Sequence, residues 1–153
     1  MARGYSFNLK LTDYTDEIEA LEEGALETLL EAIGLEAEGD VVIGMSSPGW
    51  IPKEPIDTGN LKNSITHRVV PSEGAVYIGT DVEYAPYVEF GTGKFAEGAS
   101  HAKTIPWHYK DDEGRWHTTS GMPPRPFLRT AIRKNIRKYK WIAEDALYSA
   151  FHD

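Results

Sequence analysis

The sequence predicts one domain of the α+β class, in which a small antiparallel sheet is preceded by a long helix and followed by another. Apolar residues recur every three or four positions over 14–46 and again over 126–151, as on one face of a helix. Between them, two short runs rich in β-branched residues flank a turn, as in paired strands. A tryptophan-rich stretch before the last helix has the pattern of a hairpin insertion.

Composition limits the classes of protein to consider. The 153 residues are 41% hydrophobic and 26% charged, as in an ordinary globular domain. We expect no membrane span, because no apolar run approaches roughly 18 residues, and no secretory leader. Cysteine is absent, which removes disulfides, thiolate metal sites and cysteine nucleophiles.

The net charge of −8 is unevenly spread along the chain. Positions 1–57 carry thirteen acidic and three basic residues, a balance of −10, and the remaining positions carry eleven acidic and thirteen basic residues, a balance of +2. Seven of these bases lie between Arg125 and Lys140. The asymmetry indicates either two solvated helix faces or an acidic and a basic surface that meet, within one subunit or between subunits.

The first helix is predicted over 14–46. Asp13 or Thr15 can cap its start, and acidic residues in its first turn suit the positive end of the helix dipole. Gly34 and Gly39 each cost about 1 kcal/mol relative to alanine in a helix interior, so the segment forms either one bent helix or two pieces. The apolar pattern continues through both glycines and favours one helix.

The region 57–92 is predicted to hold a cap, two strands and a turn. Asp57 or Thr58 caps a short helical turn that runs from Gly59 to Ser64. Strand patterns follow at 65–70 and 75–80, joined by a turn at Pro71-Ser72-Glu73-Gly74.

The segment Tyr84–Phe90 remains open between helix and strand. Pro86 near its start permits a first helical turn and disfavours an interior strand. Gly91 then suits a tight backbone turn.

The region 93–121 is predicted to be a mobile loop followed by a hairpin. Its first part, 93–104, is rich in small residues, and 105–110 with 115–119 then flank a four-residue loop. This arrangement places Tyr109 opposite Trp116 and His108 opposite His117 across the hairpin.

The last helix is predicted over about 126–151, after turns at Pro124 and Pro126. Arginines recur every four residues beside its apolar stripe, at Arg125, Arg129, Arg133 and Arg137. The first of them lie near the positive end of the helix dipole, which opposes them, so an acidic partner would explain the placement better than solvent does. The candidate partners are acidic residues of the first helix, Glu19, Glu22, Glu23, Glu27 and Glu31, and the alternative partner is nucleic-acid phosphate.

Catalytic and metal-binding patterns are weak. His108 and His117 are too few for a closed zinc site, and a surface aromatic pair explains them better. Asp57-Thr58-Gly59 and Glu89-Phe90-Gly91-Thr92-Gly93 lack the lysine and glycine spacing of a phosphate-binding loop. We therefore expect no enzymatic activity, no metal and no cofactor. The pair His108 and His117 is the one feature of the sequence that would support a metal-dependent or hydrolytic enzyme.

Three phrases, read in order, resemble the tail-completion or head–tail joining (neck) proteins of long-tailed bacteriophages and prophages. They are Ile56-Asp57-Thr58-Gly59-Asn60-Leu61-Lys62-Asn63-Ser64-Ile65, then Tyr84-Ala85-Pro86-Tyr87-Val88-Glu89-Phe90-Gly91-Thr92, then Pro124-Arg125-Pro126-Phe127-Leu128-Arg129-Thr130-Ala131. Thr104-Ile105-Pro106-Trp107 and Gly114-Arg115-Trp116-His117 resemble the hairpin insertion of one subtype. The likeness covers roughly 14–150, and the proline-rich linker 45–55 is longer than the family pattern.

The resemblance implies a non-enzymatic virion protein of the neck or upper tail, made in the host cytoplasm. Its expected partners are further copies in a ring, head-completion or connector proteins, and tail tube or tail terminator proteins, with no membrane and no specific nucleic acid. The expected interface residues are the four arginines above with Glu19, Glu23, Glu27, Trp107 and Trp116, and the expected structural turns are Asp57, Thr58, Gly59, Pro86, Gly91, Pro124 and Pro126. The alternative function is nucleic-acid binding, in which the basic helix contacts phosphate and the tryptophan hairpin stacks on bases.

Overall fold

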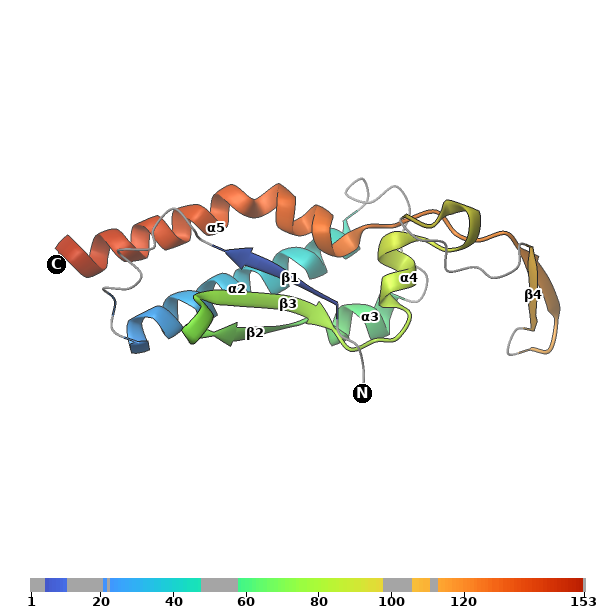
Figure 1. Ribbon diagram of the computed structural model, residues 1–153, viewed down its shortest axis with the longest axis horizontal. Helices are drawn as coiled ribbons and strands as arrows, with labels where there is room; N and C mark the ends of the chain where they lie inside the picture. Colours follow the sequence, from blue (N-terminus) through green and yellow to red (C-terminus); the bar gives the residue numbers. More distant parts are fainter. Residues whose placement is uncertain are drawn as a thin grey trace.

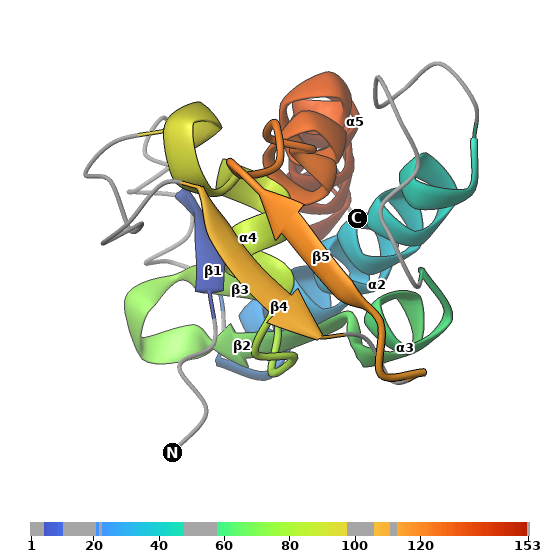
Figure 2. The ribbon, with the colours of Figure 1, turned by 90° about the vertical axis from the view of Figure 1, so that its right-hand side faces the viewer.

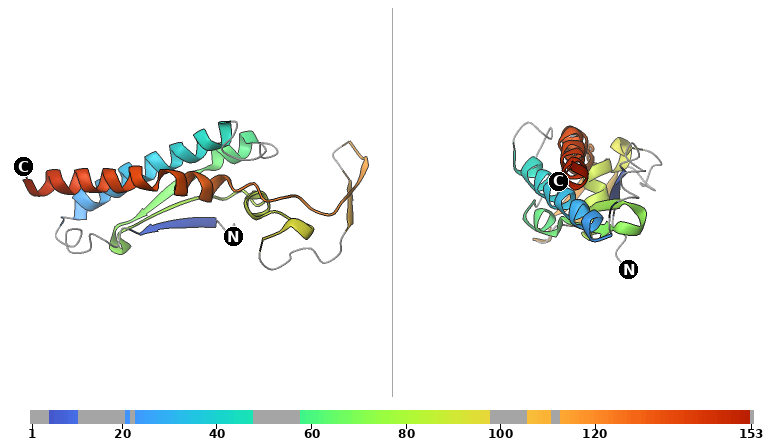
Figure 3. Two further views of the ribbon diagram at one scale, coloured as in Figure 1. Left: turned by 90° about the horizontal axis from the view of Figure 1, so that it is seen from above. Right: turned by 90° about the vertical axis from the view of Figure 1, so that its left-hand side faces the viewer.

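The computed structural model describes residues 5–10, 21, 23–47, 58–97, 106–110 and 113–152, and it has the α+β fold that the sequence predicts. Two long antiparallel helices, α2 (Glu23–Ser46) and α5 (Phe127–His152), lie side by side on one face of a three-stranded sheet (Figures 1 and 3). The strand order in the sheet is β1-β3-β2, and both pairings are antiparallel.

The sheet has one strand that the sequence interpretation missed. The strands β2 (Thr66–Val70) and β3 (Ala75–Thr80) form the predicted hairpin, whose connection closes at Gly74 with a φ of 59°. The strand β1 (Tyr5–Lys10) pairs with the other edge of β3, from Tyr5 opposite Thr80 to Lys10 opposite Ala75. Its alternation of apolar and polar residues is the period-two signal of a strand and could have revealed it.

The helix α2 is a single helix that passes through both glycines, and it begins at Glu23 rather than at position 14. Leu21 lies in a bend, and positions 14–20 and 22 are outside the described residues. Gly34 has a packing reason, since a Cβ there would lie 2.3 Å from Cδ2 of His67, whereas a Cβ on Gly39 would meet nothing within 4 Å.

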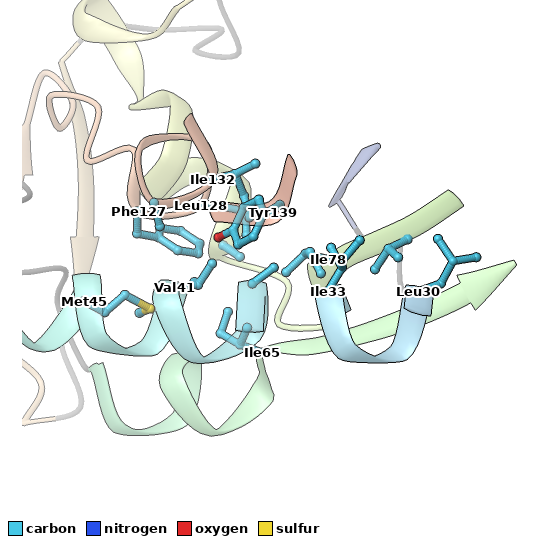
Figure 4. Packing of buried hydrophobic residues seen from close by; sticks show 14 of the residues in the cluster. Leu30, Ile33, Val41, Met45, Ile65, Ile78, Phe127, Leu128, Ile132 and Tyr139 are labelled. Atoms are coloured by element: carbon cyan, nitrogen blue, oxygen red, sulfur yellow. The ribbon is translucent and has the colours of Figure 1, made fainter. Parts of the chain in front are cut away.

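The core lies between the helix pair and the sheet (Figure 4). Ile33 and Val41 of α2 pack with Phe127, Leu128 and Tyr139 of α5, and all five side chains are buried. Ile78 from β3 and Leu61 from α3 (Thr58–Ser64) complete the same cluster. The short helix after position 57 is thus confirmed. Of its two predicted caps, Asp57 lies outside the described residues and Thr58 is the first residue of the helix.

A charged seam joins the two long helices. Asp40 is 7% exposed and accepts hydrogen bonds from Tyr139 Oη at 2.8 Å and from Lys138 Nζ at 2.6 Å. Lys138 also contacts Glu36 at 3.0 Å. Burial, with the hydrogen bond to Asp40, raises the pKa of the Tyr139 phenol, so this group stays a donor to Asp40.

The ambiguous segment after β3 is a helix, α4 (Ala85–Phe90), with Pro86 in its first turn as the sequence permits. A short 3-10 helix, η3 (Gly93–Phe95), follows it. Positions 93–97 therefore form hydrogen-bonded structure and not the mobile loop predicted from 93 onwards, and positions 98–105 lie outside the described residues.

The predicted hairpin forms, but in a different register. The strands β4 (Trp107–Lys110) and β5 (Trp116–Thr119) pair Lys110 with Trp116, Tyr109 with His117 and His108 with Thr118. The expected pairs, Tyr109 with Trp116 and His108 with His117, are wrong by one residue. Arg115 belongs to the loop and not to the strand, and Gly114 there takes a φ of 81°.

Candidate assembly surfaces

The second and third sequence phrases meet at the N-terminus of α5, which we call the junction. Glu89 of α4, 3% exposed, accepts hydrogen bonds from the backbone N–H groups of Leu128 at 2.9 Å and Arg129 at 3.1 Å. These N–H groups have no partner within their own helix, so a side chain 39 positions away caps α5. The Arg125 N–H donates to the Val88 carbonyl at 2.7 Å and ties the same two segments together.

Arg129 completes the junction. Its Nε lies 3.3 Å from Glu89 Oε1, its Nη1 donates to Glu97 Oε2 at 2.6 Å, and its guanidinium lies 5.2 Å from the centre of the Phe90 ring. Burial raises the pKa of Glu89, while the backbone N–H groups of Leu128 and Arg129 and the Arg129 charge oppose the rise. The hydrogen bond from Arg129 lowers the pKa of the Glu97 carboxyl.

Two glycines bring the ends of the arm into close contact at the junction. Thr92 N–H donates to the Met122 carbonyl at 2.9 Å, and Lys94 N–H donates to the Ser120 carbonyl at 3.0 Å. A Cβ on Gly93 would lie 2.1 Å from the Ser120 carbonyl oxygen, and a Cβ on Gly121 would lie 2.1 Å from that of Thr92. Both positions also have positive φ, so only glycine lets the two backbones approach this closely.

The predicted turn residues fit this geometry. Gly91 has a φ of 77°, and a Cβ there would lie 2.8 Å from Cδ of Pro124. Pro126 directly precedes the first residue of α5. The second and third phrases, which look like turn signals in the sequence, thus build one packed junction.

The hairpin β4–β5, which we call the arm, projects from the junction at the end of the molecule far from the C-terminus of α5 (Figures 1 and 2). Trp116 is 71% exposed, and Lys110 Nζ lies 5.7 Å from the centre of its ring. His108 pairs with Thr118 through a 2.8 Å hydrogen bond. Since neighbouring positions of a strand face opposite ways, this register puts His108 and His117 on opposite faces of the arm, so they do not form the metal pair considered above.

The arginine stripe does not run straight along α5. Arg125 precedes α5, and because four residues advance a helix by about 400°, Arg129, Arg133 and Arg137 each lie about 40° further round than the one before. Arg129 consequently points into the junction, where its acids are Glu89 and Glu97 rather than the predicted acids of the first helix. Arg133 and Arg137 are exposed, and they are the members of the stripe that remain candidates for a partner surface.

The predicted acidic partners have other roles or positions. Glu19 lies outside the described residues, Glu23 begins α2, and Glu27 is exposed. The bases that contact the acids of α2 are Lys138 at the seam and His67 on β2. The sequence does not reveal these pairs, because each base meets its acids only after the chain has folded back on itself.

His67 lies between two carboxylates of α2. Its Nδ1 is 2.7 Å from Glu38 Oε2 and its Nε2 is 2.8 Å from Glu31 Oε2. A neutral imidazole has one donor nitrogen and carboxylates only accept, so the protonated ring satisfies both contacts. Burial lowers the pKa of His67, but the hydrogen bonds and charges of Glu31 and Glu38 together outweigh it and raise this pKa above its ordinary value of 6.5.

Comparison with models of known protein families, with curated proteins and with solved structures gives no match. Among the described residues, no helix has the length and apolar character that a bilayer crossing requires. What bears on function is therefore the junction, the arm, the exposed helix faces and the resemblance of the three phrases.

Proposed function

We propose that this protein is a structural component of the head–tail connector or upper tail of a bacteriophage, and that it acts by assembly rather than by catalysis. The observation that carries the proposal is the arm, a two-stranded ribbon that projects from the body and exposes 71% of Trp116. The resemblance of the three phrases to tail-completion and head–tail joining proteins supports the location of this role in the head–tail connector or upper tail.

The geometry of the arm fits a surface that binds another protein. A lone two-stranded hairpin is marginally stable in water, so contacts with a partner would stabilise it. Large exposed aromatic residues supply much of the binding energy of protein interfaces. The junction at its base is held by backbone hydrogen bonds and by close-packed glycines, so the base of the arm is fixed on the body.

In this function the chain forms a ring with further copies and contacts head-completion or connector proteins on one side and tail tube or tail terminator proteins on the other. The charge asymmetry of the sequence would act between subunits through the exposed Arg133 and Arg137. Arg129 is excluded from that role by its contacts in the junction.

The proposal is tested by removing the gene from the phage or prophage and counting joined particles by electron microscopy. We expect filled heads and separate tails, with joining restored by the wild-type gene supplied in trans. Trp116→Ser should fold but fail to restore joining, and Tyr87→Ser, which changes a half-exposed aromatic residue outside the arm, should restore it. Normal particles without the gene would sink the proposal.

One observation favours the nucleic-acid alternative, the pairing of Lys110 with the exposed Trp116 ring. In that case a gel shift with DNA should appear at low salt, weaken steeply as salt rises and be lost in Trp116→Ser. The assembly function predicts no such shift.

A further inference from the structure

The outward face of α2 has no charge. The helix holds six acidic residues and no basic ones, and four of the acids contact bases on its two flanks, Glu31 and Glu38 toward β2 and Glu36 and Asp40 toward α5. Between the flanks runs what we call the uncharged stripe, at spacings of three and four residues: Thr28, Ala32, Leu35, Gly39, Ile43 and Ser46. Leu35 is 62% exposed and Ile43 is 57% exposed. A helix that is apolar on its outer face as well as its inner face is typical of a helix covered on both sides.

Gly39 gives independent support. A glycine inside a helix is unfavourable relative to alanine, and it usually has a packing reason. Gly34 has one, because His67 fills the space beside it. Gly39 has none among the residues that the structure describes, since a Cβ there would meet no atom of theirs within 4 Å. A side chain of another molecule packed on the centre of the stripe would account for it.

The hydroxyl groups of the stripe do not need water as a hydrogen-bond acceptor. Thr28 Oγ1 donates to the Gly24 carbonyl at 2.9 Å, and Ser46 Oγ donates to the Val42 carbonyl at 2.9 Å. Both hydroxyl groups are satisfied within the helix, so covering the stripe would not leave a donor without an acceptor.

A complementary surface lies on α5, opposite its buried side. It consists of Arg133, Arg137, Trp141 and Tyr148, which we call the Trp141 face, and the exposed Glu144 lies between Trp141 and Tyr148 in the same row. Trp141 is 61% exposed and Tyr148 is 65% exposed. This helix holds six bases and two acids, the opposite balance to α2. Tryptophan, tyrosine and arginine are the residues enriched at interface hot spots.

From these observations we infer that the uncharged stripe of one copy of this chain binds the Trp141 face of a second copy. In this contact the Trp141 ring lies over Gly39 between Leu35 and Ile43, and the two arginines approach Glu31 and Glu36, whose side chains remain 51% and 53% exposed beside the stripe. A contact between two copies of α2 is disfavoured because it would bring acids against acids. The inference rests on the proposed function only in that it takes a second copy as the partner.

The test uses two double variants, each confined to exposed side chains. Leu35→Ser with Ile43→Ser removes the stripe, and Trp141→Ser with Tyr148→Ser removes the Trp141 face. Each should raise the dissociation constant for self-association by roughly 30-fold or more, the size expected when hot-spot residues are lost. Circular dichroism and thermal unfolding should stay close to those of the wild type. Tyr87→Ser is the matched control and should associate normally.

Mixing the two double variants gives the decisive measurement, by light scattering or native mass spectrometry. Each still has one intact face, so the mixture should form one-to-one heterodimers that neither variant forms alone. Failure of the mixture to associate, or a wild-type protein that stays monomeric at high concentration, would overturn the inference.

The size of the wild-type particle separates this inference from the proposed function. A closed ring supports both, since each copy then uses its two faces with different neighbours. A dimer, in which the two faces pair twice, supports the inference and counts against the ring. If the variants associate normally while phage complementation succeeds, the function stands and this interface is wrong.

Discussion

Glu89 at the base of the arm is 3% exposed and Trp116 near its tip is 71% exposed, although both belong to motifs that stand out in the sequence. Glu89 accepts hydrogen bonds from two backbone N–H groups and contacts Arg129. Trp116 has a cation–π contact with Lys110 of the paired strand. The junction is thus saturated by partners within the chain, whereas the arm leaves a large aromatic surface to solvent.

The difference separates residues that build the subunit from residues that remain for a partner. Arg129 and Arg137 show the same contrast on one helix. Arg129 has Glu89, Glu97 and the Phe90 ring around it, and Arg137 is exposed. A charge in a sequence stripe therefore indicates a partner surface only where the fold has not already supplied the opposite charge.

The largest expected effect comes from Glu89→Ala. The substitution leaves the N–H groups of Leu128 and Arg129 and the Arg129 guanidinium without their buried acceptor, so the free energy of unfolding should fall by about 3 kcal/mol. Urea denaturation of the purified variant measures it. Glu97→Ala removes the other acid from the same arginine, but Glu97 is 47% exposed and screened by solvent, so the loss should be much smaller than that of Glu89→Ala. Equal losses would contradict the contrast between a buried and an exposed partner.

The periodic parts of the fold are the parts that the sequence predicts well. The two long helices, the β2–β3 hairpin and the helical turn at α3 follow from apolar spacing and turn residues, which act over a few positions. The strand β1 carried the same kind of signal and was missed. The start of α2 and the register of the arm differ from those predicted, because a local pattern does not fix the residue at which an element begins. Arg115, for example, fits the end of a strand as well as a loop.

The site was harder to predict because its contacts join distant positions. Nothing near Glu89 in the sequence marks it as the cap of a helix that begins 38 positions later at Phe127. The same holds for His67, whose two acids come from an earlier helix. In the sequence Gly34 only weakens its helix, and the folded chain shows that it makes room for the imidazole of His67.

A smaller effect is expected at His67, in the body but partly open to solvent. Because its pKa is raised in the folded state, its contribution is fully present below the ordinary value of 6.5 and is lost as the pH rises through the raised folded value. The loss should be about 0.5–1 kcal/mol, since Glu31 and Glu38 are partly exposed. Urea unfolding at a series of pH values measures it against His67→Gln, which should lack this component. Gly34→Ala, which displaces the ring, should lack it too, and an unchanged pH profile in both variants would refute the assignment.

The smallest effect on stability is expected at Trp116, which has the highest exposed fraction of the large hydrophobic side chains in the described part of the chain. Trp116→Ser should change the free energy of unfolding by less than about 0.5 kcal/mol, because the side chain is 71% exposed. Leu128→Ser, in the core beneath the junction, should cost about 3 kcal/mol in the same urea titration. If Trp116→Ser destabilised the body as strongly, the tryptophan would belong to the subunit's own packing and the arm would lose its standing as a partner surface. If Trp116→Ser left stability unchanged while head–tail joining failed, the result would support a role of the exposed ring in contacts with another molecule.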